Sequence, residues 1–282
     1  MTKNVLLFVS IAAAACSAGV PFRIDNPTDA PITVSIDGKA HTVAPHADAA
    51  VSLAPGKHSL DAPATGKLEF IVYVGRKGGL INPTLGDYVV ANESYATNAQ
   101  TAKGFVKLQN KIVIGGERFT GPFRLHDGLF IDEDWRYGVH DEFPESESVA
   151  GGNVFGKVFA VPDFRSFYRR RYGVPEPVEP APAVKVRRIE PPPPLPTFED
   201  PEVQRATATI RDQYARYIVC DDPAEQKRLQ GATSAALTDY VTFIGPRMAK
   251  QSREDNERQN DFITQYGHAF GVSARVIARR TP

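Results

Sequence analysis

Prolines crowd one stretch of the chain and divide the sequence into two parts of different character. From Val174 to Pro196 the chain reads VPEPVEPAPAVKVRRIEPPPPLP. Each proline fixes φ and lacks a backbone N–H, so neither a helix nor a central strand can run through this stretch. We expect extended polyproline II backbone there, which rises about 3.1 Å per residue. We interpret residues 173–198 as a proline-rich linker between two modules. A docking ligand for another protein and an arm packed against its own domain are the alternatives.

The sequence before the prolines carries the period-two alternation of β-strands. Ile32, Val34 and Ile36 alternate with polar residues and lead into Asp37-Gly38, a pattern that predicts a hairpin with residues 40–43 as the returning strand. Similar runs predict further strands at residues 51–53, 58–60, 68–74, 88–91, 105–108, 111–114, 129–131 and 154–161. Short strands at such spacing are typical of a sandwich or barrel. We therefore expect an N-terminal antiparallel β-sandwich or barrel-like domain over residues 16–172.

The sequence after the prolines has the three-and-four spacing of amphipathic helices. Asp200-Pro201-Glu202 supplies an N-cap, a proline in the first turn and an early acid, ahead of an apolar stripe. A second helix should begin after Asp222 and end or kink at Gly245-Pro246, and a third should be capped by Ser252. Residues 199–282 are thus predicted to form a small C-terminal helical module, and the fold class is predicted as α+β.

The chain begins with an apolar stretch from Val5 to Ala15. It is shorter than the roughly 20 residues that span a bilayer, and it matches the apolar part of a secretory signal, which has about 7–15 residues. The small residues before Cys16 resemble the lipobox of bacterial lipoproteins. That resemblance implies a signal peptide at residues 1–15, a lipid on Cys16 and a lipid-anchored location in the periplasm or at the outer membrane. A cleaved signal without lipid is the alternative, because Ala-x-Ala cleavage sites also occur here.

A second resemblance lies within the expected β-domain. Residues 34–38, VSIDG, and residues 53–60, LAPGKHSL, are similar to the PEGA-type β-repeat of bacterial surface proteins. Those repeats are non-enzymatic. The resemblance implies a small β-unit at the start of the mature chain and agrees with the alternation described above.

Charge and cysteine content narrow the choice of partner. The chain has 33 basic and 33 acidic residues, so its net charge is zero and the basic footprint of a nucleic-acid-binding protein is missing. Cys16 and Cys220 are the two cysteines. If Cys16 is lipidated, Cys220 has no disulfide partner in its own chain, and we expect it to be buried or paired between chains.

The segment from Leu125 to Glu147 is rich in groups that bind metals. His126, Asp127, His140 and Asp141 offer imidazoles and carboxylates, which ligate zinc or calcium and serve in acid–base catalysis. Their spacing matches neither HExxH nor an EF-hand, and solvated turns use the same residue types. We expect a solvated loop here, with a metal or catalytic site as the alternative.

Two groups of aromatic residues are candidates for binding a partner. Residues 164–172, FRSFYRRRY, interleave rings with arginines, which suit anionic lipid headgroups or a protein surface. The binding candidates in this segment are Phe164, Phe167, Tyr168, Arg169, Arg170 and Arg171. We expect a final edge strand with its aromatics packed inward; binding of lipid or protein at the surface and stacking on a nucleic acid are the alternatives. Trp135 and Tyr137 are candidates for stacking on sugars. The glycine-rich run at Gly78-Gly79 is interpreted as a plain connection between strands.

Catalytic signatures are missing from the sequence. It contains neither GxSxG nor GxxxxGK[ST], the motifs of a nucleophile elbow and of a phosphate-binding loop. We therefore expect no enzyme activity and no cofactor. The expected function is that of an envelope lipoprotein that binds another protein, as a component or accessory of a cell-envelope assembly. A periplasmic toxin-immunity lipoprotein, a metal-dependent hydrolase and a cell-wall glycan binder are the alternatives.

Overall fold

The computed structural model describes residues 19–97, 110–132, 135, 137–148, 152–178, 189, 191–248 and 251–279. Cys16, the expected signal peptide and the strand expected at residues 105–108 lie outside these ranges. No helix in the described part of the chain is long and apolar enough to cross a membrane. The described strands form four sheets, none of them a closed barrel, and helices dominate the C-terminal part. The predicted α+β class is confirmed.

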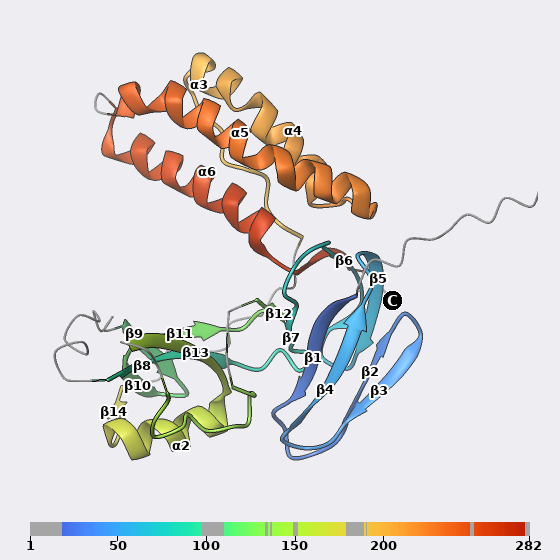
Figure 1. Ribbon diagram of the computed structural model, residues 1–282, viewed down its shortest axis with the longest axis vertical. Coiled ribbons are helices and arrows are strands. Elements are labelled where there is room, and N and C mark those ends of the chain that lie inside the picture. Colours follow the sequence, from blue (N-terminus) through green and yellow to red (C-terminus); the bar gives the residue numbers. More distant parts are fainter. Residues whose placement is uncertain are drawn as a thin grey trace, which may run out of the picture.

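Two stacked sheets form a sandwich (Figure 1). Sheet A has the order β12 (Phe130–Ile131), β7 (Gly79–Ile81), β1 (Val20–Asn26) and β4 (Ala47–Leu53). Sheet B has the order β15 (Ala274–Arg279), β6 (Gly66–Val72), β5 (Gly56–Ala62), β2 (Ile32–Ile36) and β3 (Lys39–Val43). Their facing side chains, such as Phe22, Val34 and Phe70, share one buried core. Most strand pairs are antiparallel, as expected, but β1 and β7 run parallel.

The expected hairpin is confirmed between β2 and β3. Ile36 pairs with Lys39, which leaves Asp37 and Gly38 as a two-residue loop. Their φ angles are 52° and 78°, and positive values at both positions are what a type I′ turn requires. The local sequence therefore determines the register of this hairpin.

A second sheet unit lies beside the sandwich (Figure 1). Sheet C has the order β11 (Phe123–His126), β8 (Tyr88–Ala96) and β13 (Gly152–Ala160), and sheet D has the order β14 (Glu176–Pro177), β10 (Glu117–Gly121) and β9 (Asn110–Ile114). A helix, α2 (Val161–Tyr172), shares an aromatic core with both sheets. The expected β-rich domain of residues 16–172 thus holds two sheet units.

The edge strand expected at residues 164–172 is wrong, because this segment lies in α2. Pro162 stands in the first turn of the helix, where its missing N–H has no helical partner to lose. Phe167 and Tyr168 follow Phe164 by three and four residues, so all three side chains lie on one face of the helix. All three are buried. The aromatics do pack inward, but from a helix and not from a strand.

The C-terminal part contains four helices: α3 (Pro201–Ala206), α4 (Ala208–Tyr217), α5 (Pro223–Met248) and α6 (Arg253–Gly271). The expected caps are confirmed, since the Asp200 carboxylate accepts from the N–H groups of Glu202 and Val203, and Ser252 accepts from the N–H of Asp255. Helix α5 runs through Gly245-Pro246 to Met248, so of the end or kink expected at that dipeptide, the end is wrong.

The helices are docked on the sandwich. After α6 the chain returns as β15, which pairs antiparallel with β6. Tyr73, just after β6, stacks on Tyr217 of α4 with ring centroids 4.5 Å apart. Residues 199–282 are therefore not a purely helical module, because their last strand completes sheet B.

The described prolines at the end of the expected linker also pack on this assembly. Ile189 is part of the sandwich core, and Leu195 is part of the helical core. The backbone carbonyl of Pro193 accepts a hydrogen bond from the Tyr214 hydroxyl at 2.7 Å. Ile189 and residues 191–198 thus follow the alternative of a packed arm and not that of a free spacer.

Gln226 of α5 tests the docking of the helices. Its buried side-chain amide donates to the carbonyls of Val72 and Cys220 at 3.1 and 2.8 Å and accepts from the N–H of Val74 at 2.8 Å. Gln226→Leu leaves buried backbone groups unpaired, and we expect the free energy of unfolding to fall by about 2 kcal/mol or more. Urea unfolding followed by circular dichroism measures the change. Lys227→Leu, at the exposed neighbouring position, should stay within about 0.5 kcal/mol; equal losses in both variants would contradict the docking role.

Candidate functional site

The outer face of sheet A is covered over only part of its area. Along β1, Phe22 and Ile24 point into the sandwich, so Arg23 and Asp25 point to the opposite face. At the Asp25 end the second sheet unit covers this face through a buried apolar cluster that joins Leu80 of β7 to side chains of β8 and β13. The rest of the face remains open and forms one side of a cleft.

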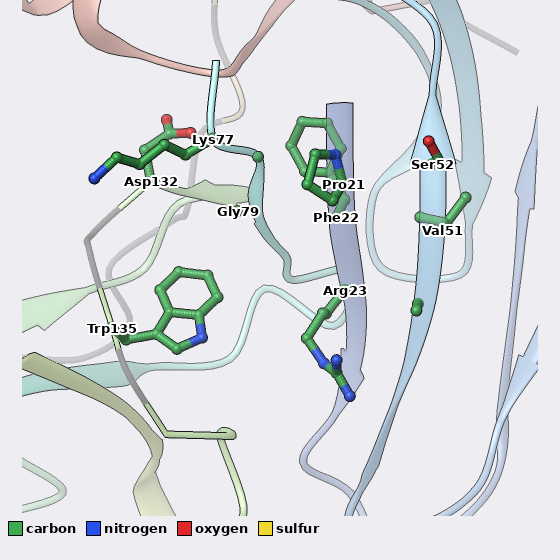
Figure 2. A pocket seen from close by; sticks show the side chains of 11 residues that line it. Pro21, Phe22, Arg23, Val51, Ser52, Lys77, Gly79, Asp132 and Trp135 are labelled. Atoms are coloured by element: carbon green, nitrogen blue, oxygen red, sulfur yellow. The ribbon is translucent and has the colours of Figure 1, made fainter. Parts of the chain in front are cut away.

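This cleft has a volume of about 580 Å³ and is shown in Figure 2. Pro21, Ala50 and Ser52 supply part of its floor from β1 and β4. These side chains are small, and that leaves room above the sheet. The indole of Trp135 forms the facing wall, across the cleft from Arg23.

Polar groups are distributed around the cleft. Arg23 forms an ion pair with Asp48 at 2.5 Å, and the hydrogen bond to that carboxylate raises the pKa of the guanidinium. Lys77 is exposed at the rim. Burial raises the pKa of Asp132, whose Oδ1 accepts from the N–H of Ser273 at 2.9 Å. The cleft therefore presents hydrogen-bonding groups of both charges beside an aromatic ring.

The sandwich and the chain that returns from α6 meet at the glycine end of the cleft. Ser273, which precedes β15, donates its hydroxyl to the carbonyl of Gly78 at 2.8 Å. Gly78 has a φ of +86°, and a Cβ there would lie 1.4 Å from the carbonyl oxygen of Pro21. A Cβ on Gly79 would lie 2.6 Å from the carbonyl oxygen of Ile131. The glycine run interpreted as a plain connection is thus a close-packed part of the site. Paired glycines at the start of a strand were the signal, because they permit such close approach.

A buried chain of polar groups lies next to the cleft, on the same face of β1. The Asp25 side chain is fully buried and accepts a hydrogen bond from the Tyr88 hydroxyl. Its other oxygen lies 2.8 Å from His140 Nε2, and His140 Nδ1 lies 2.9 Å from Asp163 in α2. The hydrogen bonds to Asp163 and Asp25 raise the pKa of His140 to about 9. Burial, followed by the nearby Asp25 charge, raises the pKa of Tyr88 far above its ordinary value.

A buried lysine fixes the turn that carries His140. Lys157 of β13 donates its ammonium to the carbonyls of Gly138 and Val139, the latter at 2.9 Å. Burial lowers the pKa of this amine to about 8, against the opposing effect of nearby carboxylates. The N–H of Gly138 donates in turn to the Asp141 side chain at 2.8 Å. The turn is therefore held by charged groups on both of its sides.

The metal candidates divide between two places. His140 and Asp141 lie in this turn, whereas His126 and Asp127 lie at the end of β11. Among the described residues no group of three or more His, Cys, Asp and Glu side chains is placed to hold a metal ion. The sequence analysis expected a solvated loop here, and for His140 this is wrong. Its side chain is only 20% exposed and bridges two carboxylates. Asp25 and Asp163 were not predicted, since they are distant from His140 in the sequence.

The aromatic and basic candidates of α2 divide between the core and the surface. Phe164, Phe167 and Tyr168 pack in the aromatic core, and of the three Phe167 also lines a surface pocket with Arg170 and Arg171. The three following arginines are exposed, and each forms an ion pair with a glutamate; the pairs are Arg169 with Glu117, Arg170 with Glu142 and Arg171 with Glu93. Tyr137 donates its hydroxyl to Glu147 at 2.5 Å, whereas Trp135 lines the cleft.

Gly78→Ala tests the close approach at the glycine end of the cleft. A Cβ at this position collides with the backbone of Pro21, and the left-handed backbone of Gly78 is itself unfavourable for alanine. We therefore expect the free energy of unfolding to fall by about 3 kcal/mol or more. Gly75→Ala is the matched control, because its φ is +69° and no atom lies within 4 Å of the added Cβ; it should lose about 1 kcal/mol from strain alone. Denaturant unfolding measures both variants, and equal losses would argue against the packing described.

Comparisons with known proteins add no relative from which a role could be transferred. No protein-family model, curated protein or solved structure matches this chain. What the protein does is therefore inferred from the geometry of the cleft and the chemistry of its side chains.

Proposed function

We propose that the protein is a non-enzymatic lipoprotein of the cell envelope that binds a segment of another protein in the cleft beside Trp135. It would act there as a component or accessory of an envelope assembly, with a lipid on Cys16 as its link to the membrane. The observation that carries the proposal is the open cleft of about 580 Å³ at the place where the sandwich, the second sheet unit and the chain returning from α6 meet.

The shape of the cleft supports a protein segment as its occupant. Ligand sites form preferentially where domains meet, and an aromatic side chain in a desolvated pocket is a typical anchor of a protein interface. Strand β4 forms one edge of the cleft and is the end strand of sheet A in the described part of the chain. An extended segment can pair with such an edge through its backbone, and a segment that continues across the open face of the sheet can reach the indole of Trp135.

The polar groups around the cleft support the same proposal. The pair of Arg23 with Asp48 and the partly buried Asp132 offer donors and acceptors at fixed positions, which give an interface its orientation. Because both charges are present, the cleft does not require a strongly acidic or basic partner. This agrees with a chain whose net charge is zero.

A glycan of the cell wall is the second candidate occupant. The observation that favours it is the indole of Trp135 set across from Arg23, with Ser52 and Asp132 on the same cleft (Figure 2). An aromatic face beside such hydrogen-bonding groups can hold the apolar face of a sugar ring and its hydroxyl groups. The protein segment remains the first candidate because of the adjacent edge of β4.

Photo-crosslinking in cells tests the occupant of the cleft. A crosslinking amino acid is placed at Ser52, inside the cleft, and as a control at Ser166, an exposed position on α2. We expect a discrete protein adduct from Ser52 alone, which disappears when the variant also carries Trp135→Ala. An adduct that disappears on digestion of peptidoglycan would identify the glycan instead. The same adducts from both positions, or none from Ser52, would contradict binding at this cleft.

Metabolic labelling with a palmitate analogue tests the anchor. The wild type should incorporate label in a bacterial host, Cys16→Ser should lose it, and Cys220→Ser should keep it, since Cys220 is the other cysteine of the chain. A cleaved wild type without label would support export without a lipid. An uncleaved and unlabelled wild type would contradict the envelope location altogether.

A further inference from the structure

His140 can donate to two ionised carboxylates only when both of its ring nitrogens carry a proton. Its Nε2 lies 2.8 Å from Asp25 and its Nδ1 lies 2.9 Å from Asp163. An ionised carboxylate only accepts hydrogen bonds, whereas a neutral imidazole has a single N–H to donate. Both bonds to ionised carboxylates therefore exist together only while the ring carries its second proton, and one of them is lost when that proton leaves.

The bridge joins the two sheet units beside the cleft. Asp25 belongs to β1 of the sandwich, and Asp163 lies in the first turn of α2 in the second unit. Trp135 packs on the buried cluster that contains Val139 and Tyr88. Val139 is the neighbour of His140 in the chain, and Tyr88 donates to Asp25. The buried cluster therefore has the bridge on one side and the indole of Trp135 packed against it on another.

We propose that Asp25, His140 and Asp163 form a latch, which holds Trp135 on the wall of the cleft while His140 is charged and releases it when His140 loses its proton. The latch is a property of the chain without any ligand. Because the latch changes the shape of the cleft, it would regulate the binding proposed above. This regulatory role rests on that proposed function.

The direction of the pH effect follows from the groups around the ring. The charged and titratable groups that surround His140 come from every element packed around it: Asp25 and Arg23 of β1, Tyr88 of β8, Lys157 of β13, Asp163 of α2 and Asp141 of its own turn. Carboxylates on both sides of the ring favour the imidazolium. Lys157 opposes it as a like charge, but the Lys157 ammonium is itself turned towards the carbonyls of the turn.

The closed latch is therefore the low-pH state. The pKa of His140 is raised from 6.5 to about 9, so the contribution of the bridge is complete below pH 6.5 and is lost as the pH rises through about 9. Between these values the ratio of open to closed latch rises about tenfold for each pH unit. Lys157, whose pKa is lowered to about 8, loses its charge in the same window. Variants at the bridge are needed to separate the two.

The sole tryptophan of the chain reports on the latch without any added ligand. Acrylamide quenching of Trp135 fluorescence is measured from pH 6 to 10 on the full mature chain, with circular dichroism to show that the fold persists. We expect the wild type to be shielded at low pH and increasingly quenched through pH 9. His140→Gln should be quenched at every pH. Asp163→Asn removes the half-exposed carboxylate, which lowers the pKa of His140, so the transition should move to lower pH.

His46→Gln is the matched control, because His46 makes an exposed pair with Asp29 at 2.8 Å far from the latch in sequence. It should leave the quenching curve unchanged. If His140→Gln fails to fold, the wild-type curve and Asp163→Asn decide the question. A flat wild-type curve, or a transition that Asp163→Asn does not move, would overturn the latch. Failure of Ser52 to crosslink a partner would overturn the proposed function and leave the latch in place.

Discussion

The fully buried carboxylate of Asp25 is the constraint on which the arrangement of the two sheet units depends. A lone charge on the outer face of sheet A would be costly to bury, so it must be paired and hydrogen-bonded. The partners come from the second unit, as the hydroxyl of Tyr88 and the imidazole of His140, and His140 reaches on to Asp163. The apolar cluster around Leu80 closes beside them. Polar pairing thus sets where the second unit lies, and apolar contact seals the joint.

The cleft is a consequence of where that covering stops. Beyond Asp25 the outer face carries small side chains on β1 and β4, and among the described residues Trp135 extends over it from the segment between β12 and β13. At the other end Asp132 and Gly78 are bonded to Ser273, so the chain that returns from α6 closes the cleft there. The helices therefore contribute to the site through the position of Ser273. A free module on a flexible linker would leave that end of the cleft undefined.

Local chemistry in the sequence predicts the elements of this fold better than it predicts the site. Asp37-Gly38 specifies a hairpin and Asp200 a helix start through contacts within a few residues, and both predictions are confirmed. The spacing of the aromatic residues in 164–172 is compatible with a strand and with a helix. Only the packing of this segment against sheets C and D selects the helix. The partners of His140 come from strands and helices distant in the chain. No spacing rule links such residues, so the site emerges only from the tertiary structure.

The chemistry chosen for this joint bears on what the joint is for. Apolar side chains of similar size could seal the two units as firmly, and often more so, because a buried ion pair must first lose its hydration. A histidine between two carboxylates adds what an apolar joint lacks, since its two bonds depend on one proton that leaves within the range of mild alkali. Val139, next to His140, and Tyr88, which donates to Asp25, belong to the cluster on which Trp135 packs. Positioning the units requires only that Asp25 be paired, whereas the proposed adjustment of the cleft wall requires a partner that titrates, and His140 is that partner.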